Sequence, residues 1–321
     1  LVNLWRKRFR DQILSTAIVD AFRSFVRSPI ALACIAPILV PTLSQALCVP
    51  DAEDVDGDRG QAIQSAIDLT SMILKYWPCD ADMPSVSLSD LLLALLQLVR
   101  TSSDDEVVIR CTNCLCRFVR MGALDGGHTS LLAAWGDALQ HLLQPDFPEQ
   151  VASCVPLLLS TVLDHAPLLL AGKQLGSLLL ALDSWLKPES RLGLTQQVLF
   201  FFAKLILAPS VGAERFLEEL LALHHEGGLT PIDRIQRVMQ LWVDIQEDVL
   251  HPPTARTMLR ALLELSTRNH RKIGFMLVST NIPTPCAIEK GRAATMTRSK
   301  RKEAAQSTST CMTMPLIARI L

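Results

Sequence analysis

The chain has 321 residues and a formal net charge of −1; 49% of its residues are hydrophobic, 5% aromatic and 20% charged. This apolar content excludes an intrinsically disordered protein, and only 18 Pro and 14 Gly exclude collagen-like and low-complexity classes. The apolar residues are mainly Leu, Ala, Val and Ile, with a single tyrosine, which favours packed helices over sheets. No segment alternates apolar and polar residues for long, so we expect no sheet.

An uncharged run extends from Ser28 to Pro50 near the start of the chain. Its length is sufficient in principle to cross a bilayer. However, Pro29, Pro37 and Pro41 interrupt it, and the run starts too far from the N-terminus for a secretory signal. We therefore expect a buried helix and no membrane span.

Periodic proline provides the clearest internal signal. One series recurs after 40 and 43 residues and a second after 42 and 43, at Pro148, Pro188 and Pro231, and at Pro167, Pro209 and Pro252. Because proline is tolerated in the first turn of a helix, each unit of about 42 residues is interpreted as two helices. A period of this length is typical of HEAT and armadillo repeats.

The sequence therefore predicts an all-α fold, a HEAT-repeat (armadillo-type) right-handed α-solenoid of about six helical hairpins over residues 1–270. One hairpin cannot bury both of its faces, whereas stacked hairpins form a continuous core. The expected hairpins are 8–27 with 30–48, 61–77 with 86–100, 106–121 with 129–143, 148–166 with 168–187, 190–208 with 212–224, and 232–249 with 253–268.

The helix expected at 232–249 shows the periodicity in detail. Thr230 before Pro231 is a start signal. One helical face carries the apolar residues, and the polar residues fall elsewhere. The apolar set is Ile232, Ile235, Met239, Trp242, Ile245 and Val249, and the polar set is Asp233, Arg234, Gln236, Arg237 and Gln240.

The small net charge conceals segregated charges. Residues 61–270 carry 15 Lys/Arg and 23 Asp/Glu, whereas residues 1–27 carry six Lys/Arg and two Asp. The loop at 51–60 is the most acidic stretch, with Asp51, Glu53, Asp54, Asp56 and Asp58. An acidic solenoid attracts basic partners, although the acids can also serve only to keep an apolar protein soluble.

Residues 271–313 are expected to form a basic flexible loop, because they contain Pro and Gly and show no apolar periodicity. The basic cluster is Arg298, Lys300, Arg301 and Lys302. Such a cluster is found in nuclear localisation signals and nucleic-acid patches, could pack against the acidic surface, or could be a solvated linker. Residues 314–321 are expected to start a further, truncated C-terminal helix of a longer protein.

No motif in the sequence indicates a metal site or a catalytic site. Cys111, Cys114 and Cys116 lack a second Cys/His pair at zinc-site spacing, so they are interpreted as buried thiols. The nine irregularly spaced cysteines as a whole are interpreted as reduced thiols in the core of a cytosolic or nuclear protein. The acidic loop does not fit a calcium-binding loop, since Ala52 and Ile63 would occupy ligand positions. We find no nucleophile–base pair or cofactor fingerprint, and we expect no enzyme, no cofactor and no metal site.

Several short runs occur in an order that resembles the C-terminal HEAT repeats of the importin-β family of karyopherins. The most specific is Thr297-Arg-Ser-Lys300 followed by Met314-Pro-Leu-Ile-Ala-Arg-Ile-Leu321. The others are Leu39-Val-Pro-Thr-Leu43, Ala66-Ile-Asp-Leu69, Asn113-Cys-Leu-Cys-Arg117 and Leu142-Leu-Gln-Pro145.

The resemblance implies a nuclear transport receptor of the cytoplasm and nucleus that binds basic cargo, such as histones or ribosomal proteins. It also implies release of the cargo by the Ran GTPase, which would bind mainly through N-terminal repeats outside this chain. The alternative is a HEAT-repeat scaffold subunit of a multiprotein complex; neither is a direct nucleic-acid reader. The candidate cargo-binding residues are Asp51, Glu53, Asp54, Asp56, Asp58, Arg298, Lys300, Arg301 and Lys302.

Overall fold

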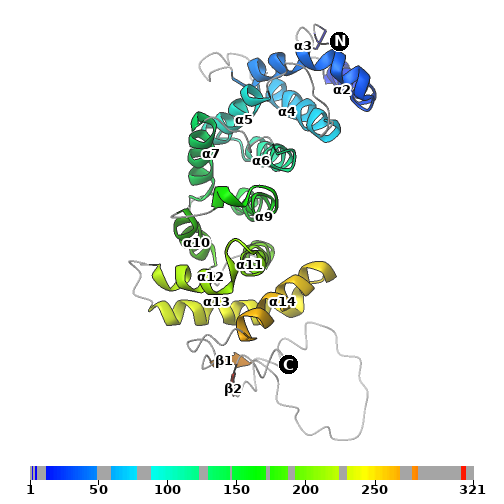
Figure 1. The fold of residues 1–321 in the computed structure, drawn as a ribbon. Coiled ribbons are helices and arrows are strands. Elements are labelled where there is room, and N and C mark those ends of the chain that lie inside the picture. Colours follow the sequence, from blue (N-terminus) through cyan, green and yellow to red (C-terminus); the bar gives the residue numbers. More distant parts are fainter. Residues whose placement is uncertain are drawn as a thin grey trace, which may run out of the picture. The chain divides into compact units, whose positions relative to one another are not determined.

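The structure is a computed structural model, and its described residues are almost entirely helical, as the sequence predicts (Figure 1). The chain divides into two compact units, residues 1–201 and 202–321, which are taken separately below. The structure describes residues 2, 4–5, 12–48, 59–77, 88–122, 129–144, 147–170, 174–186, 192–223, 230–267, 277–280 and 312–315.

The first unit contains the expected helices in the expected order. Most of their bounds lie within a few residues of the prediction. In chain order they are α2 (Gln12–Val26), α3 (Pro29–Leu47), α4 (Arg59–Tyr76), α5 (Ser89–Thr101), α6 (Asp105–Arg120), α7 (Thr129–Leu142), α8 (Glu149–Ala152), α9 (Val155–His165), the 3₁₀ helix η2 (Pro167–Leu170), α10 (Gln174–Trp185) and the first part of α11 (Leu192–Leu207).

Helices of the first unit pack in two columns. In one column α3 contacts α5 and α5 contacts α7; in the other, α2 contacts α4, α4 contacts α6 and α6 contacts α9 (Figure 1). Contacts between α2 and α3, α3 and α4, and α5 and α6 join the columns. From α2 to α6, each helix therefore packs against the next but one along the chain, with the broken α8–α9 counted as one helix, and the core lies between the columns.

Polar contacts reinforce each column from outside. Arg110 on α6 donates from Nη1 to Asp68 Oδ1 on α4 at 2.8 Å, and from Nε to Glu106 Oε1 at 2.7 Å. Asp68 and Arg110 are 42 residues apart, which is the repeat length read from the prolines. In the other column, Arg100 on α5 pairs with Asp137 on α7 at 3.3 Å.

The second unit begins within α11 and continues with α12 (Gly212–Ala222), α13 (Pro231–Ile245), the 3₁₀ helix η3 (Gln246–Asp248) and α14 (Pro252–Thr267). Helix α12 contacts both α13 and α14. Thr230 caps α13 in a capping box with Asp233, which confirms the predicted start. The predicted apolar stripe is confirmed for Ile235, Met239, Trp242 and Ile245, which are buried, but not for Ile232, which is 55% exposed in the first turn of the helix.

The prediction that the polar residues of that helix lie outside its apolar face is wrong for one of them. Arg234 was expected outside the apolar face, but only 1% of it is exposed. Its Nη1 donates to the carbonyl oxygen of Leu223 at 2.6 Å, and Leu223 caps the C-terminus of α12. A guanidinium at a helix C-terminus satisfies an orphan carbonyl and complements the helix dipole, which explains why this charge is buried.

Two expected helices are interrupted. The helix predicted at 148–166 is broken between α8 and α9, because Pro156 in the first turn of α9 has no N–H to donate to the Ala152 carbonyl. The helix predicted at 168–187 starts as the 3₁₀ helix η2 and continues as α10 from Gln174, with residues 171–173 outside the described residues. Proline therefore marks helix starts, as predicted, but it also divides one helix into two.

The expectation of no sheet is also wrong. Strand β1 (Leu277–Thr280) pairs antiparallel with β2 (Met312–Pro315), with Leu277 opposite Pro315 and Thr280 opposite Met312. Strand β1 contacts α13, so residues 277–280 and 312–313 of the predicted loop 271–313 form strands, and its residues 271–276 and 281–311 lie outside the described residues. Met314 and Pro315 end a strand and do not start a helix; proline is tolerated at a strand end because its missing N–H breaks no interior ladder bond.

Helix α3 is neither fully buried nor a clear membrane span. By length and composition alone it is the one described helix that could cross a membrane, and 39% of its most apolar stretch is buried. Leu32, Ala36, Leu39 and Leu43 face the core, whereas Ile30 and Ile38 are exposed. The predicted burial therefore applies to one face only.

We predict that Arg110→Met lowers the free energy of unfolding of the first unit by about 1 kcal/mol at low salt, because it breaks two ion pairs, one of them between helices. Urea denaturation followed by tryptophan fluorescence should show a smaller effect at high salt, since exposed ion pairs are screened. Arg23→Met, which removes a pair within one helix turn, is the control and should cost less. Equal effects of the two variants, or no salt dependence, would contradict the role of Arg110 in joining α6 to α4 within their column.

Candidate functional site

All of the predicted cargo-binding residues lie outside the described residues, so the structure does not test whether they come together. This applies to the acidic loop and to the basic cluster alike. The residues concerned are Asp51, Glu53, Asp54, Asp56, Asp58, Arg298, Lys300, Arg301 and Lys302. A site must therefore be sought on the helices themselves.

The second unit contains a groove of about 530 Å³ where the turn between α11 and α12 meets α14. We call it the α12 groove. The turn forms because Pro209 follows the end of α11 and Gly212 adopts φ +75°, a left-handed conformation that favours glycine. The groove is lined by Ile206, Leu207, Ala208, Pro209, Val211, Gly212, Ala213, Glu214, Arg215, Glu218, Arg260 and Glu264.

The α12 groove has an apolar floor and a charged rim. Ile206 is buried, and Leu207 and Val211 are half-buried, at the end of α11 and in the turn. Glu214 and Glu218 are exposed and one helical turn apart on α12, so both side chains reach the same rim. Glu264 on α14 adds a half-buried carboxylate, and Arg260 lies one turn before it.

This arrangement suits a long basic side chain. Lysine and arginine place their aliphatic stems on apolar surface while the charged end stays among polar groups. Carboxylates are strong acceptors for ammonium and guanidinium donors. Arg215 and Arg260 offset part of the negative charge; Arg215 is turned toward Glu219, with Nε to Oε1 at 3.9 Å. The groove can therefore bind a lysine or arginine side chain, with the aliphatic stem on the apolar floor and the charged end near the carboxylates of the rim.

The acidic excess extends beyond the groove over the described surface of the second unit. Among residues 202–223 and 230–267, six carboxylate residues are exposed but only two guanidinium residues. The carboxylates are Glu214, Glu218, Asp233, Asp244, Glu247 and Asp248, and the guanidinium residues are Arg256 and Arg260. A basic partner would meet a favourable field over this surface.

The predicted burial of the cysteines is confirmed for the cluster on α6 but is wrong for Cys34 and Cys48, which are exposed on and just after α3. Cys111, Cys114 and Cys116 are buried on α6, and burial raises the pKa of the Cys114 thiol to about 12. Burial also raises the pKa of Cys111 and of Cys116. Within the described part of the chain, no three His, Cys, Asp or Glu side chains are grouped to hold a metal ion. These thiols are packed as apolar groups.

No known family model matches the chain, and no curated protein matches it. The function is therefore argued from the fold and from the distribution of charge.

Sequence reasoning missed the α12 groove because its walls are far apart in the chain. Arg260 and Glu264 come from α14, whereas the floor comes from the end of α11. The available signals were Gly212 before a helix and the Glu214–Glu218 spacing of one turn. Neither signal alone indicates that α14 closes the groove, because that depends on how α12 and α14 pack.

We predict that native protein treated with iodoacetamide at pH 8 is alkylated at the exposed Cys34 and Cys48 but not at Cys114. With a pKa of about 12, roughly one Cys114 thiol in ten thousand is ionised at that pH, and the thiolate is the reacting form. Peptide mass spectrometry reports each site, and denaturant should expose Cys114 to alkylation. Rapid native labelling of Cys114 would show that α6 is not packed as described.

Proposed function

We propose that this chain is part of a HEAT-type α-solenoid of the importin-β kind, and that it binds basic protein cargo for Ran-dependent nuclear import. Three features of the fold support the solenoid. Helices of the first unit alternate between two columns, contacts recur between each of α2 to α6 and the next helix but one, and the Asp68–Arg110 pair repeats the 42-residue period. The resemblance of the sequence to importin-β family repeats supports the transport role.

The observation that carries the proposal for cargo is the acidic second unit with its α12 groove. Exposed carboxylates outnumber exposed guanidinium groups on its described surface, and the groove combines apolar floor with carboxylate rim. Histones and ribosomal proteins are rich in lysine and arginine, so the chemistry of such cargo matches both features. The groove would then anchor one side chain of a cargo that the wider acidic field attracts.

A direct test uses the complete transport protein that contains this chain, bound to fluorescent core histones. We expect nanomolar to micromolar binding that weakens as salt rises, and displacement of the histones by GTP-loaded but not GDP-loaded Ran. Acidic proteins of similar size should not bind. Histone binding that neither form of Ran affects would remove the transport proposal and favour the scaffold alternative.

The groove itself is tested by neutralising its exposed rim in this chain. Glu214→Gln with Glu218→Gln should raise the dissociation constant for histones about fivefold at low salt, since each exposed charge contributes about 0.5 kcal/mol. Asp90→Asn with Asp164→Asn removes the same charge elsewhere and is the matched control. Fluorescence anisotropy measures both, and equal losses would show that only total charge matters.

A further inference from the structure

The α12 groove is larger than a single basic side chain requires. Its volume is about 530 Å³. A β-strand takes roughly 4.8 Å by 10 Å in cross-section and 3.4 Å along the chain for each residue, which is about 160 Å³ per residue. The groove therefore has room for about three residues of an extended peptide. Two turns of a helix about 10 Å wide occupy roughly 850 Å³, so the groove is too small for a helical peptide.

The two exposed carboxylates of the rim are spaced for alternate residues of an extended peptide. Glu214 and Glu218 are four residues apart on α12, which separates them by about 6 Å along the helix axis. In an extended chain, side chains two residues apart point to the same side and lie about 6.8 Å apart. Side chains one or three residues apart point to opposite sides, so they cannot reach both carboxylates together.

We propose that the α12 groove binds an extended segment of the partner protein in which two basic residues are separated by one residue, Lys/Arg-x-Lys/Arg. One base pairs with Glu214 and the other with Glu218. Their aliphatic stems lie on the apolar floor of the groove. This inference rests on the proposed role of the groove in binding basic cargo, and it adds the sequence pattern that the groove selects.

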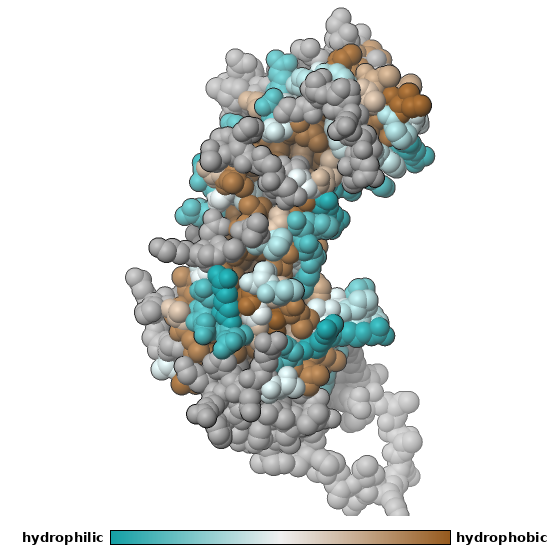
Figure 2. Space-filling model, in the orientation of Figure 1, coloured by the Kyte–Doolittle hydropathy of each residue, from teal (hydrophilic) through white to brown (hydrophobic). Residues whose placement is uncertain are grey.

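The arrangement of the neighbouring bases leaves these two carboxylates to a ligand. Arg215 is next to Glu214 in sequence but is turned toward Glu219, with Nε to Oε1 at 3.9 Å. Arg260 lies on a different helix, α14. Figure 2 shows hydrophilic and hydrophobic surface side by side over the described part of the second unit, which agrees with a charged rim beside an apolar floor.

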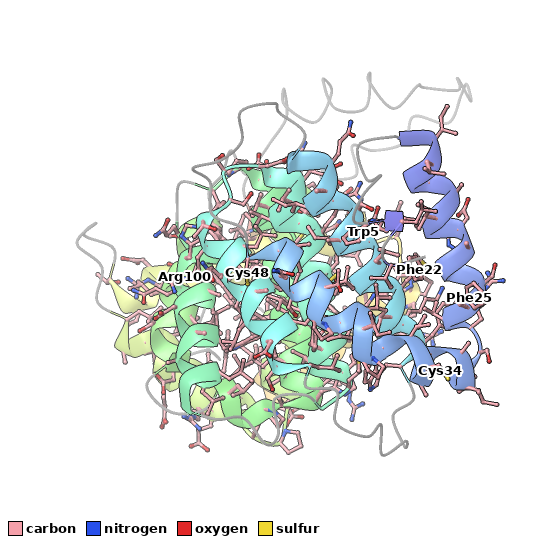
Figure 3. All side chains as sticks on the ribbon, turned by 90° about the horizontal axis from the view of Figure 1, so that it is seen from above. Trp5, Phe22, Phe25, Cys34, Cys48 and Arg100 are labelled. Carbon is pink, nitrogen blue, oxygen red and sulfur yellow. The ribbon has the colours of Figure 1, made fainter. Side chains whose placement is uncertain are left out.

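Two other acidic places on the described surface lack this combination of features. Asp244 and Asp248 are also four residues apart, but Asp244 Oδ1 and Oδ2 accept from Gln240 Nε2 at 2.8 and 2.9 Å, and neither acid lines the groove. A smaller hollow of about 260 Å³ in the first unit is lined by one carboxylate, Asp137, which pairs with Arg100 at 3.3 Å (Figure 3). Acidity alone therefore does not make either place a site for two bases.

The test measures the preferred spacing with synthetic peptides and the full 321-residue chain. Each peptide has two lysines among glycine and serine, placed as Lys-Ser-Lys, Lys-Lys or Lys-Ser-Ser-Lys, so that charge and composition are the same. Microscale thermophoresis at low salt should give a dissociation constant on the order of 1 mM for Lys-Ser-Lys and values about threefold higher for the other two. The preference should disappear at high salt, which screens both contacts.

Two variants of the chain locate the preference. Glu218→Gln should make the three peptides bind equally, each as weakly as Lys-Ser-Ser-Lys binds the unchanged chain, because one of the two carboxylates is lost. Glu247→Gln removes the same charge from another exposed position of the second unit and is the matched control, which should keep the preference. Circular dichroism should report the same helicity for all three proteins.

Chemical coupling tests where the peptide lies. A carbodiimide joins a peptide lysine to a protein carboxylate as an amide, and the water lost in the condensation converts the carbodiimide to a urea. Mass spectrometry of the digested product should find the Lys-Ser-Lys peptide predominantly on Glu214 or Glu218. Coupling predominantly to Glu247 would place the peptide outside the groove and overturn the inference.

Other outcomes separate this inference from the cargo proposal. Equal binding of the three peptides to the unchanged chain, or a preference that Glu218→Gln leaves intact, would overturn the spacing. Histones that still bind in that case keep the cargo proposal, whereas an absence of histone binding removes both. The segment Arg298-Ser-Lys-Arg-Lys302 has the proposed spacing itself. A preference seen only after its three alternate bases are replaced by alanine would make this segment the occupant and overturn the assignment to a partner protein.

Discussion

Burial of leucine on several sides of each helix is the constraint on which the first unit depends. Helix α5 buries Leu91, Leu92, Ala94, Leu95, Leu96, Leu98 and Val99. At 3.6 residues per turn these seven side chains cover about 200° of its circumference, which is more than half. It meets this requirement by contacting α3, α6 and α7 together. Two helices alone could not cover such a surface. The sequence therefore folds as a stack, in which each helix buries apolar side chains against the helices on both sides of it.

The packing of the helices determines which polar side chains can reach a partner. Arg110 can reach Asp68 because α4 and α6 are adjacent in one column, one repeat length apart. Arg234 can be buried because α13 runs past the end of α12, where the Leu223 carbonyl needs a donor. In both cases packing of apolar faces sets the positions, and the charged contacts follow from them. Individual exposed pairs of this kind contribute modestly to stability.

Much of this architecture was predictable, because helix periodicity and proline placement are local signals. Thr230-Pro231 and the 42-residue period located helices that the structure confirms. The break before α9 and the strands at Leu277–Thr280 and Met312–Pro315 were not predicted. Pro156 lies inside an otherwise periodic stretch, and the strand pair joins segments that local patterns cannot relate. The α12 groove was missed for the same reason, since it depends on which helix packs beside α12.

The proposed binding at the second unit depends on charge, so salt would screen it over about 10 Å at 0.1 M. The first unit contains a segment of the opposite kind, because no charged residue occurs from Ser28 to Cys48 and one face of α3 is buried in the core. The net charge of −1 is the sum of segments of opposite sign, since residues 61–270 carry 15 Lys/Arg and 23 Asp/Glu, whereas residues 1–27 carry six Lys/Arg and two Asp. A small net charge is therefore compatible with a strong local field, because the charges of opposite sign lie in different parts of the chain.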